Sequence, residues 1–189
     1  GVDTLFTTVK VEEPDTEPPV ITLIGDNPVE VEIGEPYVEP GATAEDNVDG
    51  DVTSQIEITG NVDTDKLGTY EVVYTVSDAA NNKTSETRTI NVVDRTAPVI
   101  TLIGDNPTKL EVGESYVESG ATAEDNVDGN VSDRIEISGT VDTSVAGEYT
   151  ITYTVSDLSG NVSDIKRKVS VEEPTEPTDP TDPGEGEDD

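Results

Sequence analysis

The sequence contains no cysteine, histidine, methionine or tryptophan, and only one phenylalanine. Without cysteine, no disulfide can form to stabilise a small domain. Without histidine or cysteine, serine has no obvious general base and no thiol nucleophile is available. Carboxylate pairs abound, but glycoside hydrolysis also needs a cleft and rings that stack on sugars, and aromatic residues are scarce here. The residue inventory therefore predicts that the protein is not an enzyme.

The charge balance is strongly one-sided, with 10 basic against 43 acidic residues and a net charge of −33. Nucleic acids and anionic membrane surfaces attract basic proteins, so neither is expected as a partner. No apolar run approaches the ~18 residues of a membrane span. The charge is compatible with cation binding and with a cell-surface setting. The chain starts at Gly1 without a signal peptide, and we expect it to be a fragment of a larger polypeptide.

An internal repeat organises the chain. The stretch 41–50 returns letter for letter at 120–129, an offset of 79 residues, and 19–28 returns at 98–107 by the same offset. A match at one fixed period marks a tandem repeat in which each copy is a unit of folding. The sequence therefore predicts two domains, repeat one at 18–94 and repeat two at 95–173.

Short runs rich in β-formers, separated by Gly, Pro, Asn and Asp, fill each repeat. The most distinct run, 69–76, places Tyr70, Val72, Tyr74 and Val76 on one face of a strand. No helical periodicity competes, and about seven short strands in about 80 residues are typical of a β-sandwich. The fold class is therefore all-β. The predicted strands of repeat one are 20–24, 29–33, a strand following 41–44, 55–59, 69–76 and 84–93.

The two ends of the chain differ from the repeats. Residues 1–17 are predicted to be a short extended leader, in which 7–11 alternates like the run 89–93. That alternation suggests the last strand of a truncated preceding module, and a disordered leader is the alternative. Residues 174–189 are acidic and rich in Pro and Thr, with no apolar side chain beyond proline, which predicts a disordered linker.

Several runs together resemble a known family. They are Pro-Val-Ile-Thr-Leu, Gly-Ala-Thr-Ala-Glu-Asp-Asn-Val-Asp-Gly, Val-Asp-Thr and Gly-Thr-Tyr-Glu-Val-Val-Tyr-Thr-Val-Ser-Asp. In this order they resemble bacterial immunoglobulin-like domains of the group-three type, which occur in tandem on surface proteins. The resemblance covers about 18–173 and implies two tandem immunoglobulin-like β-sandwiches. It also implies that Tyr70 and Tyr149 form a tyrosine corner, with each hydroxyl bonded to upstream backbone.

Acidic loops are the main candidate for a binding site. The loop 46–51 has three carboxylates and a turn-making glycine, which resembles calcium loops, although the EF-hand spacing is absent. In an immunoglobulin-type sandwich this loop, the loop 78–82 and the incoming chain share one pole, so acidic groups should converge there. The alternative is that these residues only make solvated turns. The predicted calcium ligands are Asp15, Asp46, Asp49, Asp51, Asp78, Asn82, Asp94, Asp125, Asn126, Asp128, Asp157 and Asn161.

The favoured function is a non-catalytic spacer or stalk in a bacterial cell-surface or secreted protein, with calcium stiffening the junction between the repeats. The alternative is an adhesin or a substrate-binding accessory module of a secreted enzyme. The near-identical acidic loops of the two repeats favour the spacer, because a binding tip would vary its loops. We expect an extracellular monomer that contacts neighbouring domains of its own polypeptide. The acidic tail resembles the wall-spanning stretch before a sortase anchor, which makes the cell wall a second expected partner.

Overall fold

The computed structural model describes residues 13–174. The strand predicted at 7–11 and the predicted disorder from residue 175 onward lie outside these residues. Contacts divide the chain between Asp94 and Arg95 into two units, and each unit holds one repeat.

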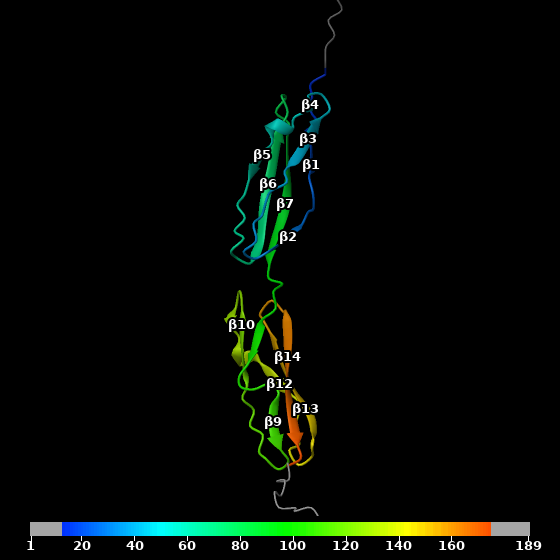
Figure 1. Ribbon diagram of the computed structural model, residues 1–189. Coiled ribbons are helices and arrows are strands. Elements are labelled where there is room, and N and C mark those ends of the chain that lie inside the picture. The colour runs from blue at the N-terminus through cyan, green and yellow to red at the C-terminus, as the bar shows by residue number, and fades with distance from the viewer. Residues whose placement is uncertain (1–12, 175–189) are drawn as a thin grey trace, which may run out of the picture. The chain divides into compact units, whose positions relative to one another are not determined.

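Repeat one consists of two mostly antiparallel sheets that pack face to face (Figure 1). One sheet has the strand order β1-β3-β4 and the other has the order β2-β7-β6-β5. Its elements are β1 (Val20–Leu23), β2 (Val29–Glu32), β3 (Ala42–Asp46), β4 (Gly50–Asp51), the 3₁₀ helix η1 (Thr53–Gln55), β5 (Glu57–Thr59), β6 (Gly68–Ser77) and β7 (Lys83–Val93).

Repeat two has the same arrangement, with the sheets β8-β10-β11 and β9-β14-β13-β12. This confirms the predicted all-β fold with two tandem sandwiches. Within the described residues no helix is long and apolar enough to cross a membrane. The elements are β8 (Val99–Leu102), β9 (Thr108–Glu111), β10 (Ala121–Asp125), β11 (Gly129–Asn130), η2 (Ser132–Arg134), β12 (Glu136–Ser138), β13 (Gly147–Ser156) and β14 (Val162–Glu172).

One strand pair in each repeat is parallel, whereas the others are antiparallel. In repeat one, β2 runs parallel to β7, with a register from Val29 opposite Ile90 to Glu32 opposite Val93. The bond from Ile33 N to Val93 O, at 2.8 Å, extends this ladder beyond β2. The second strand of the repeat therefore lies beside the strand that ends it.

The core forms where the predicted apolar face of β6 meets the other sheet. Val72, Tyr74 and Val76 are buried, and Ile90 of β7 packs with Val72 and Tyr74. The predicted strand at 55–59 is shorter than expected, because η1 occupies its start and β5 begins only at Glu57. Ile58 in β5 is 51% exposed, since β5 is the edge strand of its sheet.

A buried arginine lies inside each sandwich, which the sequence reading did not anticipate. The Arg88 side chain has no exposed surface, although it carries a full charge. Its Nε donates to Glu39 Oε1 at 3.0 Å, and its two terminal nitrogens donate to the carbonyls of Ile24 at 2.6 Å, Gly41 at 3.1 Å and Asp26. Three carbonyls and one carboxylate thus surround a single guanidinium, whose rigid fork of donors suits such a site.

Glu39 is the counter-charge of Arg88. Burial alone would raise the pKa of this carboxyl, but hydrogen bonds from Tyr37, Tyr74 and the Gly41 N–H, together with the Arg88 charge, lower it below its ordinary value. Both charges are therefore retained inside the sandwich. Repeat two reproduces the arrangement with Arg167 and Glu118, whose Nε and Oε1 atoms are 3.3 Å apart.

The tyrosine corners have the predicted hydrogen bonds. Tyr70 donates from its hydroxyl to the Lys66 carbonyl at 2.9 Å, and Tyr149 donates to the Val145 carbonyl at the same distance. Each tyrosine thereby fixes the turn that precedes its own strand, β6 or β13. Both bonds are solvent-exposed, so they stabilise the fold less than a buried bond would.

Replacing Arg88 by methionine should destabilise repeat one by about 3–5 kcal/mol, because Glu39 and three carbonyls lose their charged partner inside the protein. The change is large against the roughly 5–15 kcal/mol that holds an ordinary domain folded. Urea unfolding of the whole chain should show the transition of repeat one moving to lower urea, with repeat two unchanged.

Arg134→Met is the matched control, since the Arg134 side chain is 38% exposed and only approaches Asp128 at 3.7 Å. A surface pair of this kind contributes about 0–1 kcal/mol. If Arg88→Met shifted the unfolding transition no more than Arg134→Met, the buried arginine would not be a main source of stability.

Tyr70→Phe should lower the unfolding free energy of repeat one by about 0.5–1 kcal/mol, since an exposed bond is worth the lower part of the usual range. Tyr149→Phe should have the same effect on repeat two. The urea midpoint of each repeat measures the cost. Unmoved midpoints in both variants would show that the corner bonds contribute nothing to stability.

Candidate metal centre

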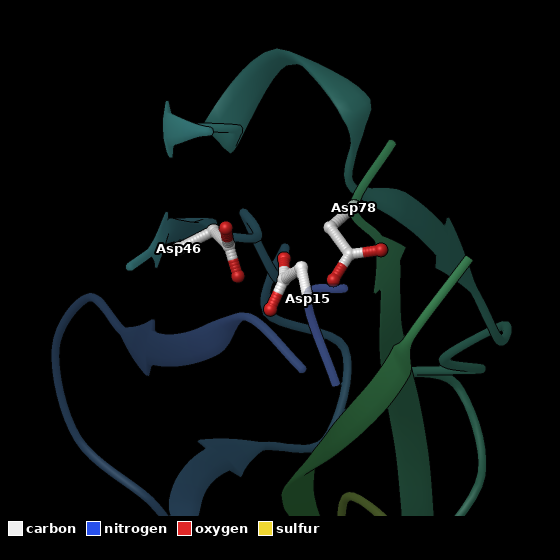
Figure 2. Close-up of side chains that lie close together, drawn as sticks. All are labelled: Asp15, Asp46 and Asp78. Carbon is white, nitrogen blue, oxygen red and sulfur yellow. The ribbon is translucent and has the colours of Figure 1, made fainter. Parts of the chain in front are cut away.

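Three separate segments bring an aspartate to one end of repeat one. Asp15 lies in the leading segment before β1, Asp46 ends β3, and Asp78 follows β6. One carboxylate oxygen from each lies within 4.8 Å of the other two. Figure 2 shows the Asp15 carboxylate between those of Asp46 and Asp78. Asp46 follows Asp15 by 31 positions and precedes Asp78 by 32. The fold brings the three carboxylates together, as the predicted convergence of acidic loops required.

Asp46 is held in place by the turn that follows it. Its Oδ1 accepts the backbone N–H groups of Asp49 and Val48, each at 2.9 Å. These two bonds lower the pKa of the Asp46 carboxyl, because they favour its charged form. Gly50 completes the turn with a φ of 72°, a conformation that residues with a Cβ rarely adopt. The side chain is only 8% exposed, and no described group hydrogen-bonds its other oxygen, Oδ2.

Asp78 is oriented by Asn82 rather than by a charge. The Asn82 backbone N–H donates to Oδ1 and the Asn82 side-chain amide donates to Oδ2, both at 2.7 Å. The same amide nitrogen lies 3.3 Å from the Asp15 carbonyl oxygen, so it also contacts the leading segment. Asn82, predicted as a ligand, is placed here as a donor that positions Asp78 and Asp15.

Asp49 and Asp51 have structural roles in the same region. Asp49 Oδ2 accepts the Ala79 N–H at 2.6 Å and joins the two loops, while Asp51 Oδ1 accepts the N–H of Thr53, the first residue of η1, at 2.9 Å. In repeat two Asn130 replaces Asp51 and makes the equivalent bond to Ser132. An amide therefore performs the role of Asp51, which does not need a charge.

The second repeat has the same set. Asp94, Asp125 and Asp157 also offer carboxylate oxygens within 4.8 Å of one another, and all three residues are buried. Asp125 is 8% exposed and its Oδ2 has no hydrogen-bond partner among the described groups. Of the other predicted ligands, Asp128 accepts the Leu158 N–H, Asn161 donates to Asp157, and Asn126 is exposed in the turn.

The chemistry of these groups is that of a hard-cation site. All the convergent side chains are carboxylates, and carboxylate oxygens are the ligands that Ca²⁺ and Mg²⁺ prefer. In repeat one the segments 13–19, 42–55 and 77–82 contain no lysine or arginine that could neutralise them, whereas the equivalent segments of repeat two contain Arg95 and Arg134. The pattern in the sequence that signals the site is the repetition of single aspartates at the same offset in three segments, rather than the acidic loop alone.

The two sandwiches define an immunoglobulin-like class of protein, and the comparison with known families specifies it further. The family model described as "Bacterial surface protein, Ig-like domain" matches residues 21–92 and again 100–171. The chain belongs to this family and holds two copies of its domain. The predicted tandem of bacterial immunoglobulin-like domains is therefore confirmed.

Relatives come from several kinds of protein. The pesticidal crystal protein Cry22Aa of Bacillus thuringiensis is 32% identical over 77% of this chain, and hyalin of Strongylocentrotus purpuratus is 36% identical over 82%. A serine-rich adhesin for platelets from Staphylococcus aureus is 34% identical over 56%. The matched regions span 21%, 14% and 9% of these relatives, respectively.

Among solved structures, a Clostridium perfringens ZmpB structure with the M60 catalytic domain and the CBM51-1 and CBM51-2 domains is similar over 81% of this chain and 30% of its own. The TM-score is 0.45 at 14% identity. The lipoprotein BT2262 from Bacteroides thetaiotaomicron is similar over 79% of this chain and 99% of its own, with a TM-score of 0.37 at 20% identity.

Asp49→Ala should speed amide hydrogen exchange at Ala79 by roughly fivefold, because the lost bond between the loops is worth about 1 kcal/mol. Exchange followed by NMR measures this amide directly. Leu158, whose N–H donates to the unchanged Asp128 in repeat two, is the internal control. Equal exchange at Ala79 with and without the Asp49 carboxylate would show that this bond does not hold the loops together.

Proposed function

We propose that the chain is a non-catalytic structural spacer within a larger bacterial cell-surface or secreted protein. Membership in a family of bacterial surface domains supports the location, and the residue inventory supports the absence of catalysis. Its partners are then the neighbouring domains of the same polypeptide, and, through the acidic tail, the cell wall. The predicted stiffening of the junction by calcium, the monomeric state and the absence of a nucleic-acid partner stay predictions.

The observation that carries the proposal is the parallel pairing of β2 with β7, repeated by β9 with β14. A spacer on a cell surface is pulled from its two ends. Pulling β2 toward the N-terminus and β7 toward the C-terminus slides two parallel strands past each other. The hydrogen bonds of that ladder then resist together, whereas a ladder opened from one end loses its bonds one at a time.

The tyrosines also favour a spacer over a sugar-binding module. Recognition of sugars relies on exposed aromatic rings, and each of the six tyrosines already has a structural partner. Tyr74 and Tyr153 are fully buried, and the other hydroxyls bond Glu39, Glu118 or turn carbonyls. The lone phenylalanine, Phe6, lies outside the described residues. Within residues 13–174, every tyrosine is therefore buried or donates a hydrogen bond to another group of the protein.

The alternative function is an adhesin or a substrate-binding accessory module of a secreted enzyme. This alternative is supported by the similarity to a serine-rich adhesin for platelets. Near-identical loops in both repeats argue against it, because a binding surface would be expected to differ between copies. Saturable binding of the whole chain to a glycan or protein surface, abolished by changing one loop, would support this alternative instead.

Single-molecule pulling on the whole chain tests the proposal. Ile33→Pro removes the N–H that bonds Val93 and should weaken the β2–β7 ladder. At constant force, one of the two unfolding events should become roughly five- to tenfold faster, as expected for the loss of one hydrogen bond worth about 1 kcal/mol.

The control is Ile33→Ala, which keeps the N–H and removes most of the side chain. The equivalent change in repeat two is Val112→Pro, since Val112 N donates to Glu172 O at 2.9 Å. A force response that is the same for the proline and alanine variants would mean that the parallel ladder does not resist the pull, and the mechanical role would be abandoned.

A further inference from the structure

We propose that each repeat binds one calcium ion through its three convergent aspartates, and that the ion fastens the leading segment of the repeat to two loops of the sandwich. In repeat one the ligands are Asp15, Asp46 and Asp78. In repeat two they are Asp94, Asp125 and Asp157. This site does not depend on the mechanical role proposed above.

The spacing of the carboxylates suits calcium. Calcium binds oxygens at about 2.3–2.6 Å, so two ligands on opposite sides of one ion are up to about 4.6–5.2 Å apart. The three carboxylate oxygens of repeat one lie within 4.8 Å of one another. One ion can therefore contact all three, and backbone carbonyls or water would complete the six to eight oxygens that calcium takes. Zinc is disfavoured because the chain has neither histidine nor cysteine.

A second, independent observation is the unpartnered oxygen of Asp46. This side chain is more than nine-tenths buried, and its Oδ1 is already occupied by two backbone N–H groups. Its Oδ2 has no hydrogen-bond partner among the described groups, and the carboxylate is turned toward Asp15 (Figure 2). Asp125 in repeat two shows the same combination of burial and an unpartnered Oδ2.

A buried carboxylate oxygen without a donor is costly, and a neighbouring carboxylate increases the cost by repulsion. In repeat one the surrounding segments 13–19, 42–55 and 77–82 supply more negative charge and no basic side chain, whereas the equivalent segments of repeat two also contain Arg95 and Arg134. Hydrogen bonds from Asn82 to Asp78, and from the Val48 N–H to Asp46, fix the orientation of these two carboxylates. The open faces of the carboxylates are then left for a cation.

The leading segment is the part most affected by such an ion. Asp15 lies in a stretch without strand pairing, and its described contacts are the Glu17 N–H at 3.1 Å and the Asn82 amide at 3.3 Å. Asp46 and Asp78, in contrast, belong to loops fixed by strands and by the bond from Ala79 to Asp49. An ion shared by all three carboxylates would therefore order Thr16 and Glu17 more than it orders the loops.

Calcium titration of the whole chain, by calorimetry and by ¹⁵N NMR, tests the proposal. We expect two ions per chain with dissociation constants of about 0.1–1 mM, the range of extracellular modules. Amide shifts should gather at 46–49 and 78–82, and heteronuclear NOE values should rise at Thr16 and Glu17. Asp46→Asn should remove one of the two sites, and adding Asp125→Asn should remove both.

The matched control is Asp51→Asn, which makes the same change of charge in the same loop and copies the natural Asn130 of repeat two. It should keep both sites and their affinities. Asp15→Asn is a second variant, in the leading segment, for the case that Asp46→Asn fails to fold. Absence of calcium heat up to several millimolar, equal losses in Asp51→Asn and Asp46→Asn, or equal binding of magnesium would each overturn the calcium site.

Discussion

The charged pair between Arg88 and Glu39 is the constraint on which each sandwich depends, with Arg167 and Glu118 in the same role in repeat two. A buried guanidinium is tolerated only where enough acceptors surround it. Here the acceptors are carbonyls from the segments that flank β1 and β3. The arginine on β7 therefore joins the four-stranded sheet to the segments of the three-stranded sheet. A domain with few aromatics and no disulfide gains from this pair a link between its layers that a small apolar core supplies only weakly.

The same domain has a second concentration of charge, and its physics is different. Around Arg88 the opposite charges meet inside the protein, and hydrogen bonds satisfy both. At the end of the repeat, Asp15, Asp46 and Asp78 bring three like charges together, and the segments 13–19, 42–55 and 77–82 that hold them contain no lysine or arginine. The turn after β3 and the amide of Asn82 hold these carboxylates in position. The first region therefore stabilises the fold, while the second is the site at which we propose that calcium binds.

Much of the fold could be predicted because its signals are local and are repeated. The alternation of β6 placed Val72, Tyr74 and Val76 in the core, and the buried faces agree. The predicted start of β5 was less accurate, because a 3₁₀ turn and an alternating strand have similar residue patterns over a few positions. Arg88 lies on the same face of β7 as Ile90 and Val92, so its position at a buried register was visible, but its partner Glu39 is 49 residues away.

The two-domain tandem, the sandwich class and the three acidic segments can be predicted from the residue pattern, because periodicity and turn residues are encoded by neighbouring positions. Which acidic residues meet depends on the packing of the folded chain. Asp46 and Asp51 belong to one short loop, yet the first is part of the cluster and the second accepts the N–H of Thr53 at the start of η1. The difference arises because side-chain direction alternates along a strand and because the packing of two sheets selects which loops come together, and neither depends on the loop composition.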